Sequence, residues 1–71
     1  MRSLTYAPMY GPTAARQIIE SACVGNPHFH DRQVRDDVTV TFEHAQHSSK
    51  AIATHEAGWV VATAWVNGDD A

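Results

Sequence analysis

Five histidines stand out in this chain of 71 residues. Imidazole binds zinc and is the side chain that titrates nearest to neutral pH. Four of the five fall in two short segments, as His28 with His30 and His44 with His47. An extended segment from His28 to His30 would place both rings on one side. Further candidate ligands are Cys23, His55 and Glu56. The sequence therefore allows a tetrahedral zinc site.

Surface histidines that make ordinary hydrogen bonds explain the same residues, and we favour that interpretation. The chain has one cysteine, no Cys-x-x-Cys pair and no His-x-x-x-His pair on a predicted helix. We therefore expect no cofactor. Zinc is kept as an alternative, with ligands drawn from His28, His30, His44 and His47.

A second alternative is a small ribonuclease in which one histidine removes the 2′-hydroxyl proton and another protonates the leaving oxygen. His28, His30 or His44 could fill these roles. Arg32 or Arg35 could hold the phosphate. Against this, the five Lys and Arg residues are scattered and the net charge is −3, whereas polyanion binding needs clustered cations. We therefore expect a protein that is not an enzyme and does not bind nucleic acid directly.

Length and composition indicate a single small domain over residues 1–71. A chain of this size buries only roughly 60% of its unfolded surface, so its core is thin. The single Cys23 excludes an internal disulfide and is typical of a reducing compartment. No apolar run approaches the ~20 residues of a membrane span. We expect a cytoplasmic protein that gains stability by associating with a partner or a second copy.

A helix is predicted over about residues 13–24. Its apolar residues recur at intervals of three and four: Ala15, Ile18, Ile19, Ala22 and Cys23. Thr13 could cap its first turn, or Gly11 could be the cap with Pro12 in the first helical position. The Gly25-Asn26-Pro27 segment ends it.

Three strands are predicted, at about residues 38–46, 51–56 and 59–66. The first of them is predicted from its alternating apolar and polar residues. Residues Arg2 to Tyr6 could add a short edge strand. The polar segment from Pro27 to Asp37 is expected to be a loop. We therefore predict an α+β fold of two layers, in which one helix packs on a small antiparallel sheet of three strands.

The last hairpin has two candidate registers, and backbone conformation decides between them. A two-residue loop would require a positive φ angle at Ala57, which is disfavoured. A three-residue loop of Glu56, Ala57 and Gly58 requires it only at glycine. We therefore predict the second register, which pairs His55 with Trp59.

The strand at 59–66 is apolar on both faces, but one helix can cover only one of them. Alternation predicts a small face for the helix, comprising Val60, Ala62, Ala64 and Val66. It predicts a second face comprising Trp59, Val61, Thr63 and Trp65. Either the N-terminal segment covers this tryptophan face or a second molecule does. Tryptophan is common at the centre of protein interfaces, so we take these four residues as the candidate contact surface.

Acidic pairs could contribute to the rim of such a surface. Asp36 and Asp37 are the candidates, while Asp69 and Asp70 follow the last strand. Their simplest role is solvation; a sharper role is complementarity to a basic partner, such as a nucleic-acid-binding protein whose groove the chain would block. The expected function is therefore protein–protein binding, as an inhibitor or accessory protein of the kind carried by phages and mobile elements. Self-association as a homodimer is the variant of the same prediction.

Overall fold

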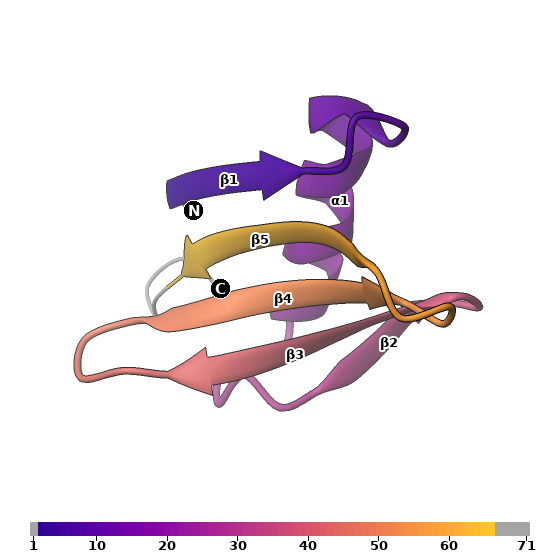
Figure 1. Cartoon of the computed structure of the whole chain (residues 1–71). Helices are drawn as coiled ribbons and strands as arrows, with labels where there is room; N and C mark the ends of the chain where they lie inside the picture. Colours follow the sequence, from indigo (N-terminus) through magenta and orange to yellow (C-terminus); the bar gives the residue numbers. More distant parts are fainter. Residues whose placement is uncertain (1, 67–71) are drawn as a thin grey trace.

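A computed structural model of the chain describes residues 2–66 (Figure 1). Its elements follow in the order β1 (Arg2–Tyr6), α1 (Gly11–Cys23), β2 (Arg32–Arg35), β3 (Val38–His44), β4 (Ser49–His55) and β5 (Val60–Val66). The strands form one antiparallel sheet in the order β1-β5-β4-β3-β2. Helix α1 crosses one face of this sheet, and so joins one edge strand to the other (Figure 1). Within residues 2–66 the structure contains no helix with the length and apolarity of a membrane span.

The α+β class with one helix on an antiparallel sheet is confirmed, but the predicted sheet of three strands is wrong. The sheet has five strands, because the edge strand considered at 2–6 is formed and pairs with β5. The fifth strand, β2, lies in the segment that was expected to be a loop. With only four residues and the single apolar Val34, it is too short to show an alternating pattern. β2 is a strand because it pairs with β3.

The element boundaries shift by a few residues from those predicted. Strand β3 ends at His44, because the chain then turns and the Ala45 N–H donates to the carbonyl oxygen of Ser48 at 2.8 Å. Strand β4 begins at Ser49 rather than at 51. Helix α1 begins at Gly11, so Thr13 does not cap it. Pro12 occupies the first turn, where its missing N–H is not needed.

The core lies between α1 and the sheet. The predicted helical stripe of Ala15, Ile18, Ile19, Ala22 and Cys23 is buried in full. Opposite it lie four buried alanines of the two central strands: Ala51, Ala53, Ala62 and Ala64. Because these side chains are short, the isoleucines of the helix can pack close to the sheet.

The β4–β5 hairpin adopts the predicted three-residue loop. The His55 N–H donates to the carbonyl oxygen of Trp59 at 2.9 Å, and Gly58 has a φ angle of 102°. Further along, however, Ala53 pairs with Ala62 whereas Thr54 pairs with Val60. Val61 is therefore an extra residue in β5, that is, a β-bulge.

Asn26 organises the loop that follows the helix. It is 6% exposed, and its side-chain amide donates to the carbonyl oxygens of Ala22 at 3.0 Å and His30 at 2.7 Å. Its oxygen accepts from the His30 N–H at 3.1 Å. This loop also carries Phe29, which is buried and stacks on Phe42 of β3 with the ring centres 5.2 Å apart. The segment before β2 is therefore anchored to the core.

Candidate binding surface

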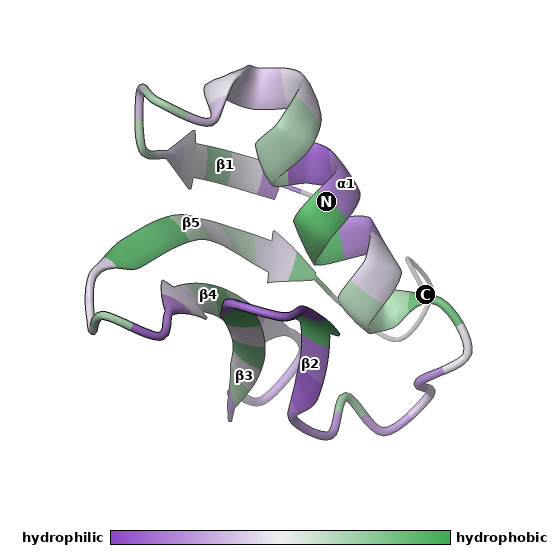
Figure 2. Cartoon of the chain, turned by 90° about the vertical axis from the view of Figure 1, so that its right-hand side faces the viewer, coloured by the Kyte–Doolittle hydropathy of each residue, from purple (hydrophilic) through white to green (hydrophobic). Residues whose placement is uncertain are grey.

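The face of the sheet opposite α1 has no helix over it in the part of the chain that the structure describes. In Figure 2 the helix lies on one side of the strands only. Residues paired across antiparallel strands point to the same face, so the register identifies the side chains on each side. Because the alanines of β4 and β5 are buried under α1, the residues between them face the other way.

Three cross-strand rows make up what we call the helix-free face. The end row consists of Arg2, Trp65, Lys50 and Glu43, in the order of strands β1, β5, β4 and β3. The middle row consists of Thr5, Thr63, Ile52 and Thr41. The far row consists of Val60, Thr54, Thr39 and Gln33, from β5 to β2.

Apolar and hydroxyl-bearing side chains dominate the helix-free face. Ile52 is half-buried in the middle row, Trp65 is half-buried in the end row, and Val60 is 51% exposed. The threonines are β-branched and therefore stiff, and two of them, Thr5 and Thr63, hydrogen-bond to each other through their hydroxyls. The face therefore combines one aromatic and two aliphatic side chains with five threonines.

The predicted tryptophan face does not exist as one surface, because the bulge at Val61 shifts the alternation. Thr63 and Trp65 lie on the helix-free face. Val61 is fully buried, and Val60 takes the outer position in its place. Trp59 belongs to the helix side, where it packs against the core.

Trp59 is covered by neighbours within the chain. Its ring stacks on His55 with the centres 4.8 Å apart and at an angle of 13°. Tyr10, which precedes α1, lies 5.8 Å away on a tilted ring. The N-terminal segment therefore covers one tryptophan, as one of the two sequence interpretations required. It leaves Trp65 on the opposite face.

Of the acidic candidates, Asp37 is engaged in holding two turns together. Its carboxylate lies 3.3 Å from His55 Nε2, and its carbonyl oxygen accepts from the Glu56 N–H at 2.8 Å. The Ala57 N–H donates to His55 Nδ1 at 3.0 Å, so the ring proton of neutral His55 resides on Nε2 and faces the carboxylate. Asp36 is exposed. Asp69 and Asp70 lie outside the described residues.

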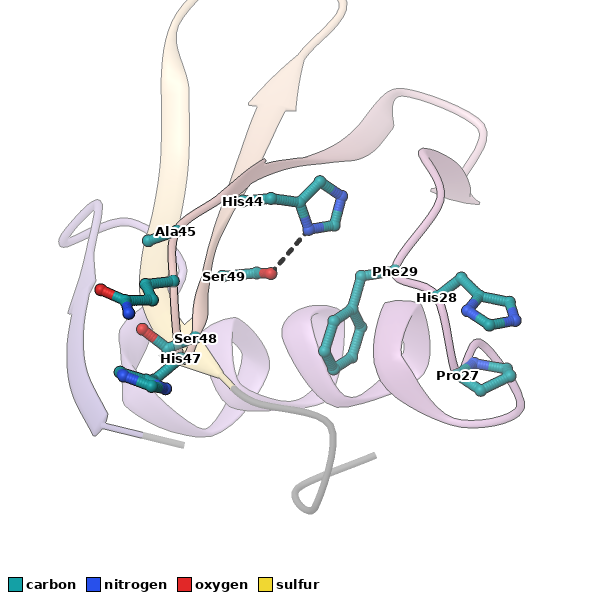
Figure 3. Close-up of a pocket in the computed structure, with 9 residues that line it drawn as sticks. Pro27, His28, Phe29, His44, Ala45, His47, Ser48 and Ser49 are labelled. Atoms are coloured by element: carbon teal, nitrogen blue, oxygen red, sulfur yellow. Dashed lines mark hydrogen bonds between the residues drawn. The ribbon is translucent and has the colours of Figure 1, made fainter.

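Three of the histidine candidates surround one open hollow of about 310 Å³ (Figure 3). His28 and His47 lie on opposite sides of it, and His44 lies between, with Nδ1 2.8 Å from the hydroxyl of the buried Ser49. His30 lies beside His28, with the ring centres 6.0 Å apart. Among residues 2–66, no three His, Cys, Asp or Glu side chains gather closely enough to hold a metal ion.

Arg32, a candidate for phosphate binding, instead binds the C-terminal end of α1. Its guanidinium donates to the carbonyl oxygens of Ser21 at 3.1 Å, Val24 at 2.7 Å and Gly25 at 3.4 Å. The Ser21 carbonyl belongs to the last turn of α1, where the negative end of the helix dipole lies, and Val24 and Gly25 directly follow the helix. The ribonuclease alternative thereby loses one of its two cations to a structural role. Arg35 is exposed.

Sequence reasoning named two of the twelve residues of the helix-free face, Thr63 and Trp65, and missed the other ten, among them Arg2, Lys50, Ile52 and Val60. The alternation of β4 does carry a signal, since Lys50, Ile52 and Thr54 alternate with alanines. That pattern places the larger side chains on the side away from the helix. Comparison with protein-family models, curated proteins and solved structures gave no match.

Proposed function

We propose that this chain acts by binding another protein molecule through the helix-free face. The main support for this proposal is the position of Trp65 and Ile52. They lie on the neighbouring strands β5 and β4, on a face over which the described chain places no helix. Most side chains of this face are polar, as is normal for an antiparallel sheet that faces water, but Trp65, Ile52 and Val60 add large apolar groups to it. Large aromatic side chains are the residues whose burial contributes most to protein interfaces.

The edges of the sheet support the same proposal. Both edge pairings contain an irregularity, between Arg2 and Thr5 in β1 and between Gln33 and Arg35 in β2. Ser3 has a φ angle of 54°, which distorts the ladder further. Short, bulged edge strands oppose the addition of a further strand. Contact through the face of the sheet is therefore favoured over contact through its edges.

A small binding protein of this kind acts by occupying the surface of its partner. An inhibitor or accessory role, in the cytoplasm and without chemistry of its own, is part of this proposal. The single cysteine is consistent with a reducing compartment. The engagement of Arg32 with the helix end weighs against the nuclease alternative.

The proposal is tested by placing a charge at the centre of the face. Ile52→Lys introduces an ammonium group between Thr63 and Thr41. Val24→Lys makes the same change at a site beyond the helix, where the side chain is 66% exposed. Tagged wild-type and variant chains, each checked for folding by circular dichroism, are used to capture proteins from an extract of the native host. A differently tagged copy of the chain is included in the extract.

We expect the wild type and Val24→Lys to retain the same molecule and Ile52→Lys to lose it. A buried unpaired charge costs several kcal/mol, enough to abolish capture. Retention by Ile52→Lys of everything that the wild type retains would exclude the helix-free face as the contact surface.

A further inference from the structure

The charges of the end row point to a specific occupant of the helix-free face. We propose that this occupant is a second copy of the chain, packed face to face about a two-fold axis. This inference rests on the proposed function, which it makes more specific. The row begins with Arg2 on β1 and ends with Glu43 on β3, with Trp65 and Lys50 between them. Its two ends therefore carry opposite charges.

A two-fold axis that runs parallel to the strands, between β5 and β4, makes this row complementary to itself. The axis reverses the strand order in the second copy but keeps each row opposite its own equivalent. Arg2 then lies opposite Glu43 of the second copy. Trp65 lies opposite Lys50 of the second copy, where the ammonium group can approach the indole ring. Symmetry repeats both contacts.

The other rows place compatible side chains opposite one another under the same axis. In the middle row Thr63 meets Ile52 of the second copy, and Thr5 meets Thr41. In the far row Val60 meets Thr54. Like charges do not face each other anywhere in the three rows. Two sheets packed in this way keep their strands within about 30° of alignment.

An axis across the strands would not pair these charges. It would lay the end row over the far row, so that Lys50 and Glu43 would face the threonines of β4 and β3, and Trp65 would face Val60. Arg2 would then lose its acidic partner. The charge pattern therefore favours the axis along the strands.

The distribution of acids also favours contact at this face. The chain carries a net charge of −3, so two copies repel each other at most orientations. Of the acids among residues 2–66, only Glu43 lies on the helix-free face, beside Lys50 and at the opposite end of the row from Arg2. The other acids of the described residues therefore lie outside this contact.

The helix-free face is small, which limits the affinity that a dimer formed through it can reach. Four strands spaced ~4.8 Å apart and three rows spaced ~6.8 Å apart cover roughly 400 Å². Standard interfaces bury about 800 Å² on each partner, so a weak dimer is expected.

Sedimentation equilibrium over about 10 µM to 1 mM tests the proposal. The apparent mass of the wild type should rise from 7.8 kDa towards twice that value. Glu43→Arg and Arg2→Glu should each raise the dissociation constant at least ~10-fold, because each places like charges opposite one another. The double variant R2E/E43R should restore it to within ~3-fold of wild type, since the pair is reversed but intact.

Matched controls carry the same charge changes on the exposed side of α1. These are Glu20→Arg, Arg16→Glu and their combination, and each should leave the dissociation constant within ~3-fold of wild type. Thermal unfolding checks that each variant is folded. If a reversal unfolds the chain, Glu43→Gln and Arg2→Gln replace it and should weaken the dimer by a smaller factor.

A wild type that stays at 7.8 kDa throughout would overturn the dimer. So would single variants with unchanged affinity, or a double variant without recovery. The proposed function has a separate outcome. If the chain is monomeric but captures a different protein that Ile52→Lys loses, the dimer is wrong and the proposed function stands.

Discussion

At the scale of single residues, Arg32 shows how position decides the role of a charged side chain. In the sequence it is one of two cations near a group of histidines. In the structure its guanidinium joins edge strand β2 to three carbonyl oxygens at the end of α1. No local pattern predicts this contact, because its partners lie 7 to 11 residues earlier in the chain.

Arg32→Met should therefore lower the free energy of unfolding by about 1–2 kcal/mol, through the loss of hydrogen bonds to the helix end. Arg35→Met removes the same charge from an exposed position of the same strand, and should change stability by less than about 0.5 kcal/mol. Urea denaturation of both variants provides the measurement. Equal losses in the two would show that the helix-end contacts do not stabilise the fold.

The two tryptophans illustrate what a residue's sequence position can and cannot say. Their types drew attention to the strand predicted at 59–66, and the hairpin loop that precedes β5 was predicted from the conformational freedom of Gly58. The two tryptophans do not share the face that was predicted for them. The bulge at Val61 moves the residues before it, Trp59 and Val60, to the opposite sides of the sheet. Because β5 is apolar on both faces, its sequence does not show where the bulge lies.

At the scale of elements, the helix and central strands were predictable because their patterns are local. The buried stripe of α1 was predicted completely, and β3 alternates apolar and polar residues from Val38 to Glu43. The edge strands were uncertain or missed because their order depends on partners distant in sequence. β2 is four residues long, and β1 pairs with a strand more than 50 residues away. Pairing of this kind is tertiary information.

The two faces of the sheet should respond differently to added volume. Ala64 is 1% exposed beneath α1, so Ala64→Leu should destabilise the fold by about 1–3 kcal/mol through overpacking. Thr41 lies on the helix-free face, and Thr41→Leu should cost less than about 0.5 kcal/mol. Thermal unfolding at low protein concentration compares the two. A larger loss in Thr41→Leu would mean that the helix-free face is packed within a single chain.

At the scale of the whole molecule, α1 covers one face of the sheet, and the described chain places no helix over the other face. The alanine-lined face forms a core with the helix, and the opposite face combines Trp65 and Ile52 with a ring of threonines and charges. The sequence predicted that one face of the last strand would need a cover other than the helix, and within residues 2–66 the helix-free face has no helix over it. It could not say which residues formed that face, since the answer depended on the bulge and on two more strands.

The most direct test of the account is to map the contact surface by NMR. Spectra of the ¹⁵N-labelled chain are recorded as the unlabelled chain, or the protein captured with it, is added. The account predicts shifts at the amides of the helix-free face, centred on Lys50, Ile52, Thr63 and Trp65, with little change along the exposed side of α1. Shifts centred on α1, with the sheet unaffected, would contradict it.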